Sequence, residues 1–91
     1  MLSAEGSDLL KRAAASKQDI FVFIATDGGF HFEGWIAKDC EKSVLLQNFT
    51  VHFPSGTVKT ANGTTVIEKE KIVAVWVSEK TLAKLEGKEN S

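Results

Sequence analysis

The sequence predicts a mainly β domain, in which an N-terminal helix precedes five antiparallel strands that form a strongly bent barrel, and a short C-terminal helix follows. Three observations predict this class. Apolar residues recur at helical spacing near the N-terminus, whereas the stretch from residue 20 to residue 77 is rich in β-branched and aromatic residues. Turn-forming residues divide that stretch, and five short strands in a chain of 91 residues close most naturally into a barrel.

The first helix is expected over residues 7–17, after a flexible tail at residues 1–6. Ser7 is a suitable N-cap, and Asp8 follows in the first turn, where the helix dipole favours an acid. Four apolar residues then recur at helical spacing, namely Leu9, Leu10, Ala13 and Ala14. This pattern indicates a short amphipathic helix.

The first two strands flank a strong turn signal, Asp27-Gly28-Gly29. Residues 20–26 read IFVFIAT and are apolar on both parities, so we expect a strand that is buried on both faces. Residues 30–37 alternate at strand period. Gly34 lies within this second strand, and a glycine lets a strand bend without a side-chain clash, so we expect the barrel to bend there.

The third strand is expected over residues 44–53, after a charged turn at residues 39–42 and before Pro54-Ser55-Gly56. Asn62-Gly63 is flanked by VKT and TTV, a pattern typical of a two-residue hairpin turn. The segment from residue 52 to residue 65 is therefore expected to be a long excursion with a hairpin turn inside it.

The last two strands are expected around residues 64–67 and 72–77, separated by a charged turn at residues 68–71. Ser78 is expected to cap a short helix that runs through Glu86 and ends at Gly87. The chain then divides into three parts: a tail at 1–6, the barrel domain with its helix at 7–77, and a helix with a tail at 78–91.

The composition narrows the class of function. A net charge of -1 and a pI near 6.1 give no overall attraction to nucleic acid or to an anionic membrane, so such binding would have to be local. The single cysteine, Cys40, forms no internal disulfide and fits a reducing, cytoplasmic setting. His31 and His52 lack metal-binding spacing, and no assembled catalytic constellation is visible. We therefore expect a protein with no cofactor, no metal, no membrane partner and no enzymatic activity.

Three segments carry a family resemblance, namely Asp27-Gly28-Gly29, Gly34-Trp35-Ile36 and Val44-Leu45-Leu46-Gln47-Asn48. Together they resemble the first motif of the Sm-like family, which comprises the Sm, LSm and bacterial Hfq proteins. The similarity to the Hfq type runs without a gap from about Asp8 to Asn48. The second motif falls on residues 66–75, where the family has a short charged turn between its last two strands.

The resemblance implies an SH3-like (Sm-like) barrel whose copies form a ring that binds single-stranded RNA. In that ring the two charged turns line the pore and hold one nucleotide per subunit. The resemblance carries this role to Asp39, Cys40, Lys42, Ser43, Lys69 and Lys71. Such a pocket needs a stacking platform, a hydrogen-bonding side chain and a cation near the phosphates.

The residues of these turns depart from the family in ways that bear on RNA binding. The stacking position falls on Glu41 or Lys42, and the Arg-Gly pair of the second motif falls on Glu68-Lys69 or Lys69-Glu70. The lysines supply cations, but the stacking platform is absent, so we expect weak stacking and a steep salt dependence. The alternative is that residues 39–42 and 68–71 are solvated hairpin turns of mixed charge.

His31 and Glu33 lie on the polar parity of the second strand, and the resemblance implies a possible second RNA face there. The alternative is that they are ordinary exposed strand positions, because Ala25 stands where that face usually has an aromatic residue. Trp76 is expected at a subunit interface or in the core. Four phenylalanines are expected in the core: Phe21, Phe23, Phe30 and Phe32.

The expected barrel leaves its first and last strands as open edges, and unpaired edges favour pairing with another chain. Repeated head-to-tail pairing closes a ring when the rotation from one copy to the next adds up to a full turn, and we expect a homo-oligomer of about five to seven subunits. The first hypothesis of function is a ring that binds single-stranded RNA, as an RNA chaperone or an RNA-processing accessory. The alternative is a structural or protein-interaction ring of the same fold that has lost the nucleotide pocket.

Overall fold

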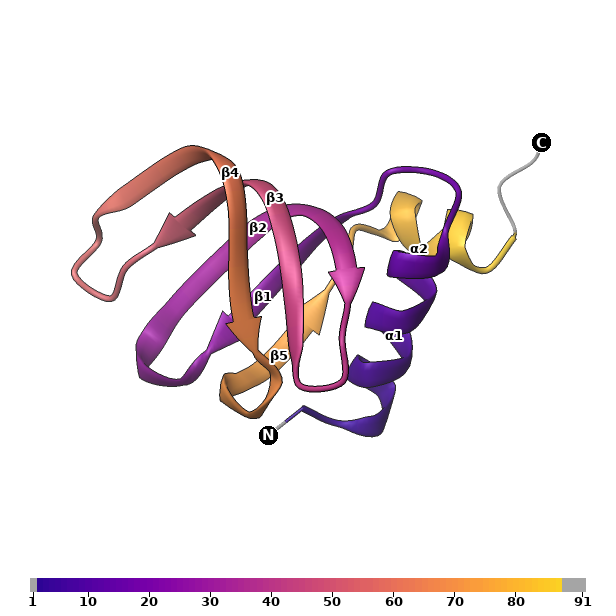
Figure 1. The fold of residues 1–91 in the computed structure, drawn as a ribbon, viewed down its shortest axis with the longest axis horizontal. Helices are drawn as coiled ribbons and strands as arrows, with labels where there is room; N and C mark the ends of the chain where they lie inside the picture. The colour runs from indigo at the N-terminus through magenta and orange to yellow at the C-terminus, as the bar shows by residue number, and fades with distance from the viewer. Residues whose placement is uncertain (1, 88–91) are drawn as a thin grey trace.

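The computed structural model describes residues 2–87 of the chain (Figure 1). Its elements are α1 Ala4–Ala15, β1 Phe21–Thr26, β2 Phe30–Asp39, β3 Ser43–His52, β4 Val58–Glu68, β5 Ile72–Trp76 and α2 Glu79–Leu85. Two single-turn 3-10 helices, η1 Asp27–Gly29 and η2 Lys69–Lys71, precede β2 and β5. The predicted order of an N-terminal helix, five antiparallel strands and a short C-terminal helix is confirmed.

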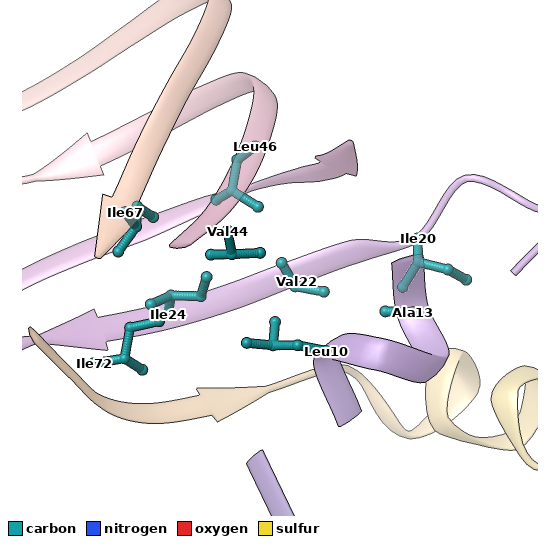
Figure 2. Close-up of a cluster of buried hydrophobic side chains, with 9 residues drawn as sticks. All are labelled: Leu10, Ala13, Ile20, Val22, Ile24, Val44, Leu46, Ile67 and Ile72. Atoms are coloured by element: carbon teal, nitrogen blue, oxygen red, sulfur yellow. The ribbon is translucent and has the colours of Figure 1, made fainter. Parts of the chain in front are cut away.

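The five strands form one antiparallel sheet in the order β4-β3-β2-β1-β5. Helix α1 packs against β2 and β5 and brings Leu10 and Ala13 to the apolar core. Figure 2 shows how these two side chains meet those of the strands and of the residue that precedes β1. The core residues are Leu10, Ala13, Ile20, Val22, Ile24, Val44, Leu46, Ile67 and Ile72.

The edges of the sheet are β4 and β5, because β1 pairs with β2 on one side and with β5 on the other. The prediction that the first strand is an open edge was therefore wrong, whereas the last strand is an edge as expected. The described chain offers no strand beyond β4 or β5, so the outward backbone groups of both strands are left for another chain or for water.

Helix α1 begins earlier than predicted. Ser3 is its N-cap, since the Gly6 N–H donates to Ser3 Oγ over 3.0 Å, and the Ser7 N–H donates to the Ser3 carbonyl over 2.9 Å. Ser7 is thus an internal helix residue and not the cap, and residues 4–6 are helix and not tail. Both serines suit a cap by type, but a start at Ser3 adds a turn and lets Leu2 pack against the core.

The sheet bends at Gly34, where the pairing of β2 with β3 is irregular. A Cβ at this buried glycine would lie 3.1 Å from both Cα and Cβ of Phe49 and 3.2 Å from the Gln47 carbonyl oxygen. The register shifts between Glu33 and Trp35, and Asn48 on β3 takes a left-handed φ of 50°. Two backbones approach each other closely here, which supports the predicted role of Gly34 as the bend point.

Asn62-Gly63 forms no hairpin turn, so that prediction was wrong. The pair lies inside β4 opposite Asn48, where β4 carries one residue more than β3, and Gly63 has no positive φ, which such a turn requires. The chain reverses instead between Phe53 and Thr57, where the Phe53 N–H donates to the Thr57 carbonyl over 2.8 Å. Pairing with β3 on both sides of Asn62-Gly63 outweighs the local turn preference, and residues 52–65 extend the β3–β4 hairpin (Figure 1).

Strand β1 is buried on one face only, contrary to the prediction of burial on both. Val22, Ile24 and Thr26 are buried, whereas the alternate residues Phe21, Phe23 and Ala25 are half-buried on the outer face. Apolar residues also occur on the outer face of this strand, where the rings of Phe21 and Phe23 pack against each other. The residues on the outside of the sheet therefore form a surface of their own.

Helix α2 follows the prediction. Ser78 caps it, with the Thr81 N–H donating to Ser78 Oγ over 3.1 Å, and Gly87 takes a left-handed φ of 72° after the last turn. Met1 and the tail expected at residues 88–91 lie outside the described residues. Within residues 2–87, no helix has the length and apolar character needed to cross a membrane.

Candidate nucleic-acid interface

The turn between β2 and β3 and the turn η2 lie side by side, and we call them the paired turns. The Lys69 N–H donates to the Lys42 carbonyl over 2.9 Å, and Ser43 pairs with Glu68 where β3 and β4 meet. The Cys40 N–H donates to the Ser43 carbonyl over 2.9 Å and closes the first turn. Two segments that are far apart in sequence thus meet at one end of the barrel, as the resemblance implies.

Asp39 and Lys69 form an ion pair between the paired turns. Asp39 Oδ1 lies 2.7 Å from Lys69 Nζ, and the two side chains are only 11% and 14% exposed. Asp39 Oδ1 is buried and has no other polar partner among the described residues, so the Lys69 ammonium group balances its negative charge. Loss of either partner would leave a nearly buried charge unpaired, and the pair therefore holds the turns together. Lys69 faces Asp39 and is not free to face a phosphate.

A hollow of about 600 Å³ opens between the paired turns. Its lining residues are Glu41, Lys42, Ser43, Glu68, Lys69 and Glu70. With Asp39 included, four carboxylates face two ammonium groups, which leaves the site with two excess negative charges. Lys42 is exposed and is the cation of this hollow that lacks an ion pair in the described structure. No aromatic side chain lines the hollow, so it has no stacking platform.

Lys71 and Cys40 stand apart from the other predicted residues. Lys71 lines a different hollow, of about 490 Å³, together with Asp27, Phe30 and Val66. Although Lys71 belongs to η2, the structure therefore does not bring its side chain into the hollow between the paired turns. Cys40 is a half-buried free thiol whose backbone, through the hydrogen bond to Ser43, shapes the turn.

The start of helix α1 borders the paired turns, which sequence reasoning missed. Leu2 and Ser7 line a hollow of about 220 Å³ with Glu41, Lys69 and Glu70. Placing residues 1–6 in a tail removed Leu2 from consideration. The signal that would have found it is Ser3, which as an N-cap starts the helix one turn earlier.

His31 and Glu33, the predicted second face, lie on the outer face of the sheet. Glu33 Oε1 is 3.3 Å from His52 Nε2, and Glu33 stands opposite Phe23, which in turn stands opposite Trp76. A hollow of about 220 Å³ is lined by Phe23, His31, Phe32, Glu33, His52 and Trp76, and we call it the outer hollow. The structure thus joins the two predicted residues to aromatic side chains that sequence analysis had placed elsewhere.

The outer face of β1, β2 and β5 carries a cluster of aromatic rings. Phe21 packs edge-to-face on Trp35 with ring centroids 5.1 Å apart, and Phe23 stacks on Trp76 at 5.7 Å with 8° between the ring planes. Phe21 and Phe23 are therefore not core residues, contrary to the prediction. Trp76 is 42% exposed, so its expected place in the core is wrong, and its place at an interface stays a prediction.

The other two phenylalanines expected in the core also differ from each other. Phe32 packs against the core as predicted. Phe30 packs edge-to-face on Phe53, with ring centroids 5.6 Å apart, and lies outside the buried core cluster.

Within the part of the chain that the structure describes, no three His, Cys, Asp or Glu residues are grouped to hold a metal ion.

Solved structures share this fold, although no protein-family model and no curated protein matches the chain. The Sm protein heptamer of P. aerophilum matches with a TM-score of 0.63 at 16% identity, over 84% of this chain and 96% of that one. The Pyrococcus abyssii Sm protein, solved with a uridine heptamer, matches with a TM-score of 0.60 at 24% identity, over 78% and 94%. A chain of the NatC complex bound to CoA matches with a TM-score of 0.64 at 10% identity, over 72% and 84%.

The chain therefore has the Sm-like fold, as the sequence resemblance implied. The matches span nearly the whole length of the two archaeal Sm chains.

Proposed function

We propose that the protein is one subunit of a homo-oligomeric ring that binds single-stranded RNA at the paired turns. The observation that carries this proposal is the hollow of about 600 Å³ that the Asp39–Lys69 ion pair and the Lys69–Lys42 backbone hydrogen bond hold open. Its volume lies within the range of small-ligand sites. The Pyrococcus abyssii protein, which shares the fold, was solved with a uridine heptamer, and this supports RNA as the ligand.

The sheet edges support the ring. Val58 and Val66 on β4 are 54% and 61% exposed, and Val73 on β5 is 54% exposed. Pairing of β4 of one copy with β5 of the next would satisfy both edges and cover these side chains. The P. aerophilum protein is a heptamer, which favours seven within the expected range of about five to seven subunits. Action as an RNA chaperone or processing accessory in the cytoplasm is the finer part of this proposal.

In this proposal the residues of the paired turns have different roles. Lys42 faces a phosphate, and the Ser43 hydroxyl donates to a phosphate or to a base edge. Asp39 acts through Lys69 by fixing the two turns, and Cys40 acts through its backbone. Because no ring stacks on the base, binding is mainly electrostatic, and log K should fall with log salt by about 0.7 for each phosphate neutralised.

A second candidate is a ring that serves assembly or protein contacts and binds no RNA. Two observations favour it: the excess of two negative charges at the paired turns and the absence of a stacking side chain there. The chain of the NatC complex that shares the fold also belongs to a protein assembly. Repulsion between the acidic turns and phosphates would then exclude RNA from the site.

Fluorescence anisotropy of labelled oligo(U) and oligo(A), titrated over salt after light scattering has fixed the mass, tests the proposal. Lys42→Glu should abolish RNA binding and leave the ring intact. Lys80→Glu, at an exposed position on α2, is the matched control and should leave the affinity unchanged. An unchanged affinity in Lys42→Glu would refute the role of the paired turns.

The same titration separates the two candidates. Micromolar binding with a preference between the two oligonucleotides would support a nucleotide pocket built from these residues. An intact ring that binds neither oligonucleotide at low salt would instead support the protein-interaction ring. Lys69 is left unchanged in this experiment, because its substitution would break the nearly buried pair with Asp39 and confuse folding with binding.

A further inference from the structure

The outer hollow lies on a surface separate from the paired turns. It is formed by residues from β1, β2, β3 and β5, and Trp76, Phe23 and Glu33 lie in one row across three adjacent strands. Its volume of about 220 Å³ is smaller than the roughly 300–1,000 Å³ of typical small-ligand sites. The size therefore fits one side chain of a partner better than a complete small molecule.

The charges around the outer hollow favour a cation. Glu33 is its one carboxylate, and no lysine or arginine lines it. The Glu33 side chain is 30% exposed, and its partly desolvated carboxylate attracts a positive group more strongly than a fully hydrated one would. A phosphate would find no positive partner here, so the chemistry opposes a nucleic-acid backbone.

The rings of the outer hollow strengthen this preference. Phe23 and Trp76 are nearly parallel, whereas the His31 ring stands at 75° to Trp76 with centroids 6.4 Å apart. Aromatic faces carry negative charge density and attract alkylated ammonium groups. A lysine ammonium is strongly hydrated, and methylation replaces its hydrogen bonds to water with apolar contact that suits aromatic walls.

The geometry points to the outer hollow as a binding site for a methylated lysine side chain of a partner protein. Trp76 and Phe23 supply the aromatic contact, and Glu33 supplies the opposite charge. This inference needs neither the ring nor RNA binding, so it stands or falls independently of the proposed function.

The two tryptophans of the chain make the test direct, because they give two indole N–H signals in an NMR spectrum. Trp76 reports on the outer hollow, and Trp35, which packs on Phe21, serves as the internal control. Trp35→Phe assigns the two signals. At pH 8, a trimethyllysine peptide should shift the Trp76 signal saturably and leave Trp35 unmoved. The unmodified lysine peptide should bind several-fold more weakly.

Two further ligands separate charge from apolar contact. Choline should shift the Trp76 signal, and its uncharged counterpart 3,3-dimethyl-1-butanol should not. Equal shifts by both would overturn the cation site. Saturable binding of choline without binding of the trimethyllysine peptide would overturn the assignment to a protein partner.

Variants test the roles of the individual side chains. Glu33→Gln keeps the shape, removes the charge and should weaken trimethyllysine binding about two- to fivefold, whereas Glu5→Gln, on α1, should have no effect. Trp76→Leu should abolish binding, and since Trp76 is 42% exposed the domain should still fold. A Trp76 signal that responds to oligo(U) and to neither ammonium ligand would overturn the inference in favour of an RNA face at His31 and Glu33.

Discussion

Gly34→Ala should destabilise the domain by about 1–3 kcal/mol, the usual cost of forcing an extra carbon into a packed site. The added Cβ would lie 3.1 Å from the Phe49 Cα and 3.2 Å from the Gln47 carbonyl oxygen. Both are backbone atoms, so the clash is relieved only if β2 and β3 separate at the bend. In a domain of this size, each kcal/mol lowers the Tm by about 4–8 °C.

Urea unfolding followed by tryptophan fluorescence measures the effect, at one fixed protein concentration because association adds to apparent stability. The midpoint should fall while the slope stays constant. Gly63→Ala is the matched control, because a Cβ there meets nothing within 4 Å and the backbone has no positive φ. It should be neutral or stabilise by up to about 1 kcal/mol. Equal effects of the two substitutions would refute the close approach at Gly34.

Three other predictions use the same protein. Ser3→Ala should cost about 1 kcal/mol as the loss of an N-cap, and Ser7→Ala should cost less; urea unfolding in which Ser7→Ala is the more harmful would contradict the observed helix start. Asp39→Asn should cost about 2–3 kcal/mol, and its combination with Lys69→Met should cost less than the sum of the single changes. If the costs of the two single changes simply add, Asp39 and Lys69 do not stabilise each other. Val66→Glu, on the β4 edge, should lower the mass found by light scattering to that of a monomer, and an unchanged mass would remove β4 from the assembly contact.

The sequence predicted the fold wherever local pattern and long-range packing agree. Gly34 stands in a strand of clear alternation, and its close contact with β3 follows from the bend that any such barrel requires. Asn62-Gly63 has equally clear local chemistry but lies opposite Asn48, where β4 carries one residue more than β3 between the paired positions. Pairing between strands decided that position, and no local pattern reports on the partner strand.

The surfaces were harder to predict because they depend on which side of a strand faces the core. Phe21 and Phe23 alternate with Val22 and Ile24, so both parities of β1 are apolar and hydrophobicity alone does not choose between them. The ion pair of Asp39 with Lys69 joins residues from different turns, and sequence spacing carries no sign of it. The resemblance located the turns, but only the structure shows that Lys69 is already occupied.

The fold and the nucleotide pocket have separable physical causes in this chain. The bend depends on backbone approach at Gly34, and the paired turns are held by an ion pair and a backbone hydrogen bond, none of which needs RNA. The same barrel therefore occurs at 10% and 24% identity in chains from very different assemblies. The hollow between the paired turns and the outer hollow each hold more carboxylates than ammonium groups, so each favours a cationic group of a partner over a phosphate. RNA binding at the paired turns must then come from Lys42 against that excess, which makes the Lys42→Glu titration the measurement that decides between an RNA ring and a protein-interaction ring.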